Sequence, residues 1–175
     1  MSKLISQHPE FPAEPQGVYN ALLRATIGQQ ISNRAAKTIR LRLTSQIGLS
    51  ADQLFQAAEE DLRACGLSPR KVRTLKVVAE SELQGRFRPL ELADDLEFQQ
   101  ELIQLPGVGP WTAQMVLLFG LHRPDVWPIR DHGLKSAAAS IYGVCVEEEL
   151  IELGRRFRPF RSHAAWYLWR SLGND

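Results

Sequence analysis

Residues 105–120 of this chain read LPGVGPWTAQMVLLFG, and this stretch decides the fold. Two glycines, Gly107 and Gly109, flank a valine, and an apolar segment with helical spacing follows at once. Glycine admits a positive φ and leaves no side chain to block a close approach. The stretch therefore predicts a hairpin between two helices, whose exposed amides and helix dipole suit an anion. The structural alternative is a plain helix–turn–helix connection that ends one helix with glycine.

The rest of the chain is predicted to be helical as well. Ser32, Ser50 and Ser68 each precede a segment with helical periodicity and are suitable N-caps. Further helices are expected over residues 17–30, 60–66, 69–83, 96–104 and 110–120. Three more are expected to begin at residues 131, 147 and 162. The sequence contains no convincing strand pair and no repeat. It therefore predicts an all-α protein of about ten short helices, which pack as lobes rather than as one long bundle.

Length and composition exclude several classes of protein. The 175 residues are 44% hydrophobic and 23% charged, which is typical of a globular chain with a core of its own. No apolar run approaches the roughly 20 residues that span a bilayer, and the N-terminus lacks a signal segment. We therefore expect a cytoplasmic protein with no membrane partner. Cys65 and Cys145 are expected to be buried free thiols, and two cysteines cannot supply a four-cysteine iron–sulfur cluster.

Charge is segregated along the chain, although the net charge is only +1. Residues 15–51 contain no acidic residue, and neither do residues 153–174. The basic residues of the first of these stretches are Arg24, Arg34, Lys37, Arg40 and Arg42. This pattern predicts either one basic and one acidic face or ordinary solvated helix faces.

Four further elements lie in a fixed order around the hairpin. The segments ATIGQQIS (25–32) and GLSPRK (66–71) precede the LPGVG hairpin, Asp131 follows it, and RPFRSH (158–163) lies near the end. Together they resemble the helix-hairpin-helix DNA glycosylases, in the branch of 3-methyladenine DNA glycosylase II. The resemblance implies a two-lobed all-α fold with a DNA- and base-binding cleft between the lobes. Residues 18–123 would form the barrel lobe with the hairpin, and residues 1–17 and 124–175 the lobe with the catalytic aspartate.

Trp111 distinguishes two kinds of chemistry within this family. Bifunctional members carry a lysine at the matching position, and its amine attacks the sugar and leads to strand cleavage. A tryptophan offers no such nucleophile. The resemblance therefore implies a monofunctional glycosylase of base excision repair, which hydrolyses the N-glycosidic bond of alkylated purines (3-methyladenine, 7-methylguanine) and leaves an abasic site.

Asp131 matches the catalytic aspartate of the family. Its carboxylate would stabilise an oxocarbenium-like transition state and orient water. The alternative is that Asp131 only N-caps the helix that follows, and both roles are compatible. Asp125 is expected to be a loop aspartate.

The damaged base must be flipped out of the duplex and held against aromatic surfaces. A cationic alkylated purine stacks well on an indole, and Trp111 matches the family's stacking residue. Trp127 and Tyr19 are further candidates for the base pocket, although a core position for Trp127 is an equal alternative. Trp166 and Trp169, on the last helix, are expected to lie in the core.

The resemblance also implies contacts to double-stranded DNA, the expected partner of a monomer. Gln30 matches the residue that fills the hole left by the flipped base, with a polar helix cap as the alternative. The DNA phosphates would be held by the amides of Gly107 and Gly109, and by Thr112, Lys71 and Arg34. A structural Na⁺ or K⁺ would bind the main-chain carbonyls of Ile103, Leu105 and Val108, and no cofactor is required. Affinity should fall steeply with salt.

Two other functions remain open at this point. One is a monofunctional glycosylase for deaminated or oxidised bases. The other is a non-catalytic module that uses the hairpin only to bind DNA. The presence of both Asp131 and Trp111 argues against the second alternative.

Overall fold

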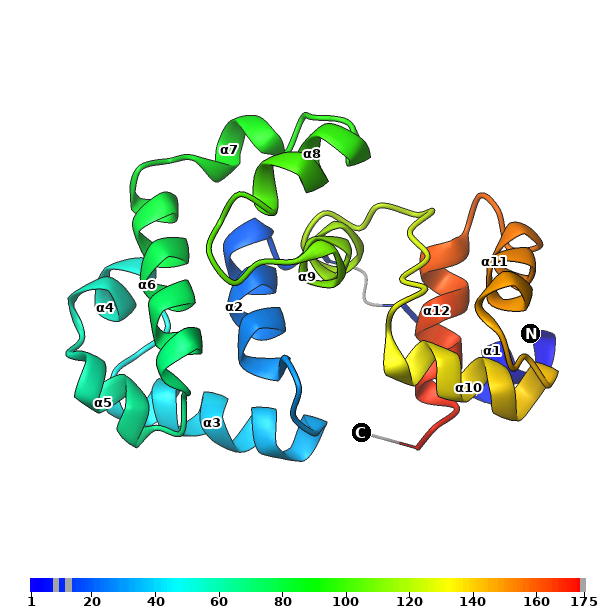
Figure 1. Cartoon of the computed structure of the whole chain (residues 1–175), viewed down its shortest axis with the longest axis horizontal. Helices are drawn as coiled ribbons and strands as arrows, with labels where there is room; N and C mark the ends of the chain where they lie inside the picture. Colours follow the sequence, from blue (N-terminus) through cyan, green and yellow to red (C-terminus); the bar gives the residue numbers. More distant parts are fainter. Residues whose placement is uncertain (8–9, 12–13, 174–175) are drawn as a thin grey trace.

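The computed structural model describes residues 1–7, 10–11 and 14–173. This part of the chain forms twelve α-helices and one π-helix, and no strand (Figure 1). The helices are α1 (Ser2–Gln7), α2 (Val18–Gly28), α3 (Asn33–Gln46), α4 (Ala51–Gln56), α5 (Glu59–Ala64), α6 (Pro69–Leu83), α7 (Phe87–Leu90), α8 (Asp95–Leu102), α9 (Pro110–Met115), η1 (Val116–Gly120), α10 (His132–Tyr142), α11 (Glu147–Arg155) and α12 (Arg161–Arg170). The predicted all-α class is confirmed, and the short helices α1 and α7 are the two that the sequence pattern missed.

Local signals explain where several helices begin. The Ser32 side chain accepts a hydrogen bond from the Ala35 amide at the start of α3 (3.3 Å). Ser50 caps α4, and its amide is bonded in turn by the Gln53 side chain, which completes a capping box. Ser68 caps α6, with proline at the first helical position. These three N-caps are confirmed as predicted.

The helices form two groups along the long axis of the molecule. Figure 1 shows α2 to α9 on one side and α1 with α10, α11 and α12 on the other. We call these groups the first and the second lobe; the residue boundaries given above stay predictions. One buried cluster, around Leu23 and Leu75, lies within the first lobe. A larger cluster runs from Leu22 of α2 through Leu117 to Leu134 of α10, so a continuous apolar core joins the two lobes.

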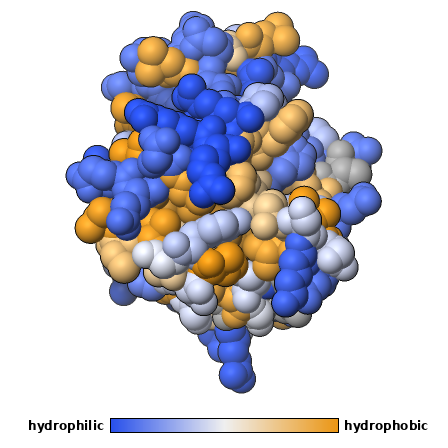
Figure 2. Space-filling view, turned by 90° about the vertical axis from the view of Figure 1, so that its right-hand side faces the viewer, coloured by the Kyte–Doolittle hydropathy of each residue, from blue (hydrophilic) through white to orange (hydrophobic). Residues whose placement is uncertain are grey.

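The surface of the second lobe mixes polar and apolar side chains. Figure 2 views the molecule from this end and shows hydrophilic and hydrophobic groups interspersed. The exposed residues here include Glu147 at the start of α11 and the apolar Val146 just before it. Cys65 is buried, but Cys145 is exposed in the loop before α11, so the expectation of two buried thiols was wrong for Cys145. None of the helices in the described ranges has the length and apolar character needed to cross a membrane.

Candidate functional site

The two hairpin glycines differ in backbone conformation and in what surrounds them. Gly107 has a φ of +82°, and a Cβ there would lie 2.0 Å from the Thr74 hydroxyl oxygen on α6. Gly109, the N-cap of α9, has a φ of −112°, and a Cβ there would meet nothing within 4 Å. Gly107 is therefore required for the packing of the hairpin against α6. Gly109 is not required by the fold, and the missing side chain leaves open space beside the start of α9.

Gln29, which sequence reasoning did not single out, holds the hairpin in place. Its side-chain amide donates to the carbonyl of Gly107 (3.1 Å) and to the hydroxyl of Thr112 (2.9 Å). The Thr112 side chain is buried and serves as an internal acceptor. Its hydroxyl is therefore not presented to a phosphate, which corrects that part of the prediction for Thr112.

Lys71 is also used inside the protein. Its ammonium group donates to the carbonyl oxygens of Ile27 (2.7 Å) and Gln29 (2.8 Å) at the end of α2. Partial burial lowers the pKa of Lys71. The side chain satisfies carbonyls that the helix end leaves unpaired, so the structure gives Lys71 a structural role in place of the predicted phosphate contact.

Asp131 lies where the second lobe faces the hairpin helix. It is the N-cap of α10, and its Oδ1 accepts a hydrogen bond from the Leu134 amide (2.7 Å). Its own amide donates to the Pro128 carbonyl (2.8 Å). The capping role that the sequence offered as an alternative is therefore confirmed, and the side chain still has acceptor capacity for other groups.

Two tryptophans from different lobes converge on the Asp131 carboxylate. The indole N–H of Trp111, on α9, donates to Oδ2 at 2.8 Å. The indole N–H of Trp169, on α12, donates to Oδ1 at 2.7 Å. Together with the Leu134 amide these are three uncharged donors, and within the described residues no cation pairs with this carboxylate. Trp169 packs against the core, as expected, and its bond to Asp131 is a second role that the sequence did not predict.

Gly133 makes room for this arrangement. A Cβ at Gly133 would lie 3.0 Å from Cδ1 of Trp169 and 3.2 Å from Oδ1 of Asp131. Glycine is unfavourable inside a helix, so its presence in the first turn of α10 needs a reason. The close approach of the indole to the carboxylate explains this glycine, which is a sequence signal that could have pointed to a partner for Asp131.

Trp127 lies in the core of the second lobe and not at the wall of a cleft. It is only 6% exposed, and its indole N–H donates to the Leu150 carbonyl (3.0 Å). Its ring packs so closely on α11 that a Cβ at Gly154 would lie 2.5 Å from the indole nitrogen. Trp127 is thus placed where the structural alternative put it, and it does not join Trp111 beside Asp131.

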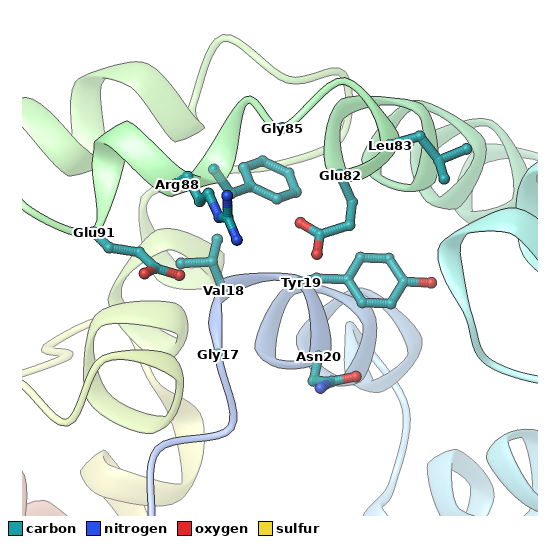
Figure 3. A pocket seen from close by; sticks show the side chains of 10 residues that line it. Gly17, Val18, Tyr19, Asn20, Glu82, Leu83, Gly85, Arg88 and Glu91 are labelled. Atoms are coloured by element: carbon teal, nitrogen blue, oxygen red, sulfur yellow. The ribbon is translucent and has the colours of Figure 1, made fainter.

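Tyr19 also lies elsewhere. Its hydroxyl donates to the Leu49 carbonyl (2.9 Å), and its ring lines a cavity of about 460 Å³ in the first lobe. Figure 3 shows Glu82 pointing toward Tyr19 in this cavity, with Arg88 beside it. Burial, and then the charge of Glu82, raise the pKa of Tyr19 to about 12. None of the residues around Asp131 lines this cavity, so the structure does not bring Tyr19 to the predicted base pocket.

The remaining predicted DNA contacts are exposed. Gln30 follows α2, is exposed, and has a φ of +57°, a left-handed conformation that is uncommon outside glycine. Arg34 is exposed in the first turn of α3. Both positions can reach a partner outside the protein.

The hairpin carbonyls that were predicted to hold a cation fit that role only in part. The Leu105 carbonyl accepts a hydrogen bond from the Val108 amide (3.0 Å). Within the described ranges, the carbonyls of Ile103 and Val108 have no such partner. In the same part of the chain, no group of three or more His, Cys, Asp and Glu side chains is arranged to hold a metal ion.

Asp125, in the loop between η1 and α10, forms an ion pair with Arg161 of α12. The guanidinium of Arg161 donates to both of its carboxylate oxygens, from Nε to Oδ1 (2.7 Å) and from Nη2 to Oδ2 (2.9 Å). Burial raises the pKa of Asp125, but the hydrogen bonds and charge of Arg161 outweigh it, with a smaller effect of Arg158, and the net shift is downward. Arg161, one of the arginines near the end of the chain, is thus committed to an internal partner.

Comparison with known proteins identifies the family. Residues 23–157 match the family described as HhH-GPD superfamily base excision DNA repair protein. The chain therefore belongs to this superfamily, which confirms the resemblance carried by the hairpin and Asp131.

Individual relatives are similar to this chain over most of its length. DNA-3-methyladenine glycosylase 1 of Schizosaccharomyces pombe is 32% identical over 183 residues, which cover 97% of this chain and 79% of that protein. DNA-3-methyladenine glycosylase 2 of Escherichia coli is 25% identical, over 86% of this chain and 56% of that protein. The structure of the S. pombe 3-methyladenine DNA glycosylase in complex with abasic DNA superimposes with a TM-score of 0.88 at 28% identity, covering 98% of this chain and 90% of that one.

Proposed function

We propose that this protein is a monofunctional DNA glycosylase that flips alkylated purines of the 3-methyladenine type out of duplex DNA and releases them by hydrolysis. The observation that carries the proposal is the Asp131 carboxylate, held by the indole N–H groups of Trp111 and Trp169 without a cationic partner in the described residues. The relatives named for 3-methyladenine support the substrate class. We further infer that it acts as a monomer in the cytoplasm, as the sequence leads us to expect.

Asp131 would act on the sugar. Loss of the base leaves positive charge on the sugar ring in the transition state, and a nearby carboxylate stabilises that charge. Neutral donors hold the carboxylate in one orientation and leave its charge in place, whereas an arginine would cancel that charge. Asp131 would also orient the water that adds to the sugar, and the product would be an abasic site.

Trp111 would hold the flipped base. Its ring is partly exposed at the start of α9, and its N–H is bonded to the carboxylate. An electron-poor methylated purine that stacks on this indole is brought close to Asp131 by the same contact. Because Trp111 stands where a lysine nucleophile would be needed, no strand cleavage is expected.

The hairpin would grip the DNA backbone. The open space at Gly109 allows a phosphate to approach the backbone amides there without meeting a side chain. Gln30, on its strained and exposed loop, would fill the gap left by the flipped base. When bound, a monovalent cation would add positive charge near that phosphate, held by the carbonyls of Ile103 and Val108 with that of Leu105.

The decisive experiment is a base-release assay on duplexes that each carry one lesion. The panel contains 3-methyladenine, 7-methylguanine, hypoxanthine and 8-oxoguanine, and abasic sites are revealed by alkali. We expect release of the methylated purines, release slower by about 10²- to 10³-fold in the Asp131→Asn protein, and no nicking when alkali is omitted. Release of only hypoxanthine or 8-oxoguanine would assign the deaminated or oxidised class instead. DNA binding with no base release from any duplex would indicate that the protein is a non-catalytic DNA-binding module.

The hairpin glycines provide a matched pair of variants for the DNA grip. Gly109→Ala has room for its methyl group and should fold normally, but the methyl group should obstruct the phosphate and weaken duplex binding about tenfold. Gly107→Ala forces a Cβ against Thr74 at a positive φ and should lower the free energy of unfolding by about 1–3 kcal/mol. Duplex titrations and thermal unfolding distinguish the two. Unchanged duplex affinity of Gly109→Ala would contradict a phosphate site at this point.

A further inference from the structure

A second cavity lies in the first lobe, between the exposed face of α2 and helix α3. Its volume is about 270 Å³, and the described residues that line it are Gln16, Asn20, Leu23, Arg24, Arg40 and Leu49. None of these residues takes part in the hydrogen bonds around Asp131. Because pockets for whole small molecules usually measure about 300–1,000 Å³, this cavity suits a small ion or a single functional group.

Two arginines line this cavity. Arg24 comes from α2 and Arg40 from α3, and neither guanidinium has a hydrogen bond or an ion pair within the described residues. Partial burial, and then the charge of Arg40, lower the pKa of Arg24. Arginine remains protonated in proteins, so the cavity holds two positive charges that repel each other.

The surroundings do not neutralise this pair. None of the lining residues is acidic, and the sequence contains no Asp or Glu between residues 15 and 51. The side-chain amide of Asn20 is already bonded to the Gln16 carbonyl (3.0 Å), and Figure 3 shows Asn20 pointing away from Glu82. Leu23 and Leu49 supply apolar walls. The cavity therefore has the charge and the donors to bind an anionic group.

We propose that Arg24 and Arg40 bind a phosphate group in this cavity. A free phosphate or a phosphate monoester carries up to two negative charges, and a backbone phosphodiester carries one. Each planar guanidinium can donate two parallel hydrogen bonds to the phosphate oxygens. Two sources supply this chemistry. One is a backbone phosphate of bound DNA, since Arg24 lies about one turn before the end of α2, on the helix that leads to Gln30. The other is a small phosphorylated molecule.

The first arm of the test uses inorganic phosphate without DNA. Phosphate is titrated into the protein at constant ionic strength, and amide NMR shifts of α2 and α3 are followed. We expect saturable shifts around Arg24 and Arg40, and binding weaker by at least about tenfold in the double variant Arg24→Gln/Arg40→Gln. Arg42→Gln is the control, because it removes one arginine charge from α3 outside the cavity. Its phosphate affinity should stay within about twofold of the wild type.

The second arm distinguishes the two sources. Each phosphate neutralised by a protein cation contributes about 0.9 to the slope of log affinity against log salt for duplex DNA. If DNA is the source, the double variant loses one phosphate contact, so its slope should be shallower by about 1 than that of the Arg42→Gln variant. If a small phosphorylated molecule is the source, the two slopes should agree although the double variant has lost phosphate binding.

The proposal is overturned if the wild-type amides near Arg24 and Arg40 do not respond to phosphate, or if the double variant binds it as tightly as the wild type. Because the first arm contains no DNA and no lesion, neither result affects the proposed glycosylase activity.

Discussion

Asp125 and Asp131 lie in the same loop region between η1 and α10, and the protein treats their carboxylates in opposite ways. Both side chains are partly buried and both accept several hydrogen bonds. Asp125 receives them from the Arg161 guanidinium, so its charge is balanced at short range. Asp131 receives them from two indoles and a backbone amide, all of them neutral.

This difference separates a structural carboxylate from one that is available for chemistry. An arginine partner fixes a carboxylate but also cancels most of the field that it exerts on its surroundings. Neutral donors fix it equally well, and leave its negative charge to act on positive charge that develops nearby. The Asp125 pair joins the start of α12 to the loop before Trp127, whereas Asp131 is held ready at the junction of the two lobes.

Replacement of each aspartate by asparagine should give the largest contrast. Asp131→Asn keeps a good N-cap and a similar shape but loses the charge and one of the two oxygens that accept an indole N–H. Base release should therefore fall by about 10²- to 10³-fold with duplex affinity nearly unchanged. Asp125→Asn should leave base release within about threefold of the wild type, because its charge is already paired. Single-turnover rates on a 7-methylguanine duplex measure both. Equal losses in the two variants would break the comparison.

The neutral donors to Asp131 can be tested one at a time. Trp169→Phe keeps an aromatic ring on α12 but removes one N–H, and base release should slow by about tenfold. Since Trp169 would act through Asp131, the loss should fall on kcat and leave KM unchanged. Trp111→Phe should raise KM as well, because this ring is also proposed to hold the base. A rise in KM alone for Trp169→Phe would contradict a positioning role.

The sequence predicted the features that depend on neighbouring residues. Ser32, Ser50 and Ser68 are caps because each bonds an amide three residues away, and such signals can be read directly from the chain. The hairpin and Asp131 were found through the order and spacing of matched segments. The class of fold follows from these local elements, since short helices with apolar faces must pack against one another.

The sequence could not predict which side chains meet across the fold. Trp127 was a candidate for the base pocket with a core position as an equal alternative, and its ring lies in the core against α11. Trp169 is 38 residues from Asp131 and bonds to it directly. Lys71 has the charge expected of a phosphate contact, but its ammonium group donates to carbonyl oxygens at the end of α2. Each of these outcomes depends on tertiary packing, and of the local features only Gly133 could have hinted at one of them.

The smallest expected effect is the response of the Asp125 pair to acid. Because the pKa of Asp125 lies below its ordinary value of 3.8 in the folded protein, the pair stabilises the fold fully above that value. This stabilisation is lost as the pH falls through the lower folded-state pKa. Asp125→Asn should therefore reduce the free energy of unfolding by about 1 kcal/mol at neutral pH, and the difference from the wild type should shrink below about pH 4.

Urea denaturation of both proteins between pH 7 and pH 3 measures this difference. A gap that grows toward acid would mean that Arg161 does not hold Asp125 in its charged form. Arg155→Gln is a suitable control, because its ion pair with Glu152 is more exposed and should contribute less at every pH. The loss of unfolding free energy in Asp125→Asn at neutral pH could be no larger than the loss in the control. In that case solvent screens the Arg161 charge, and Arg161 does not neutralise Asp125. The contrast with Asp131 would then rest on the neutral donors alone.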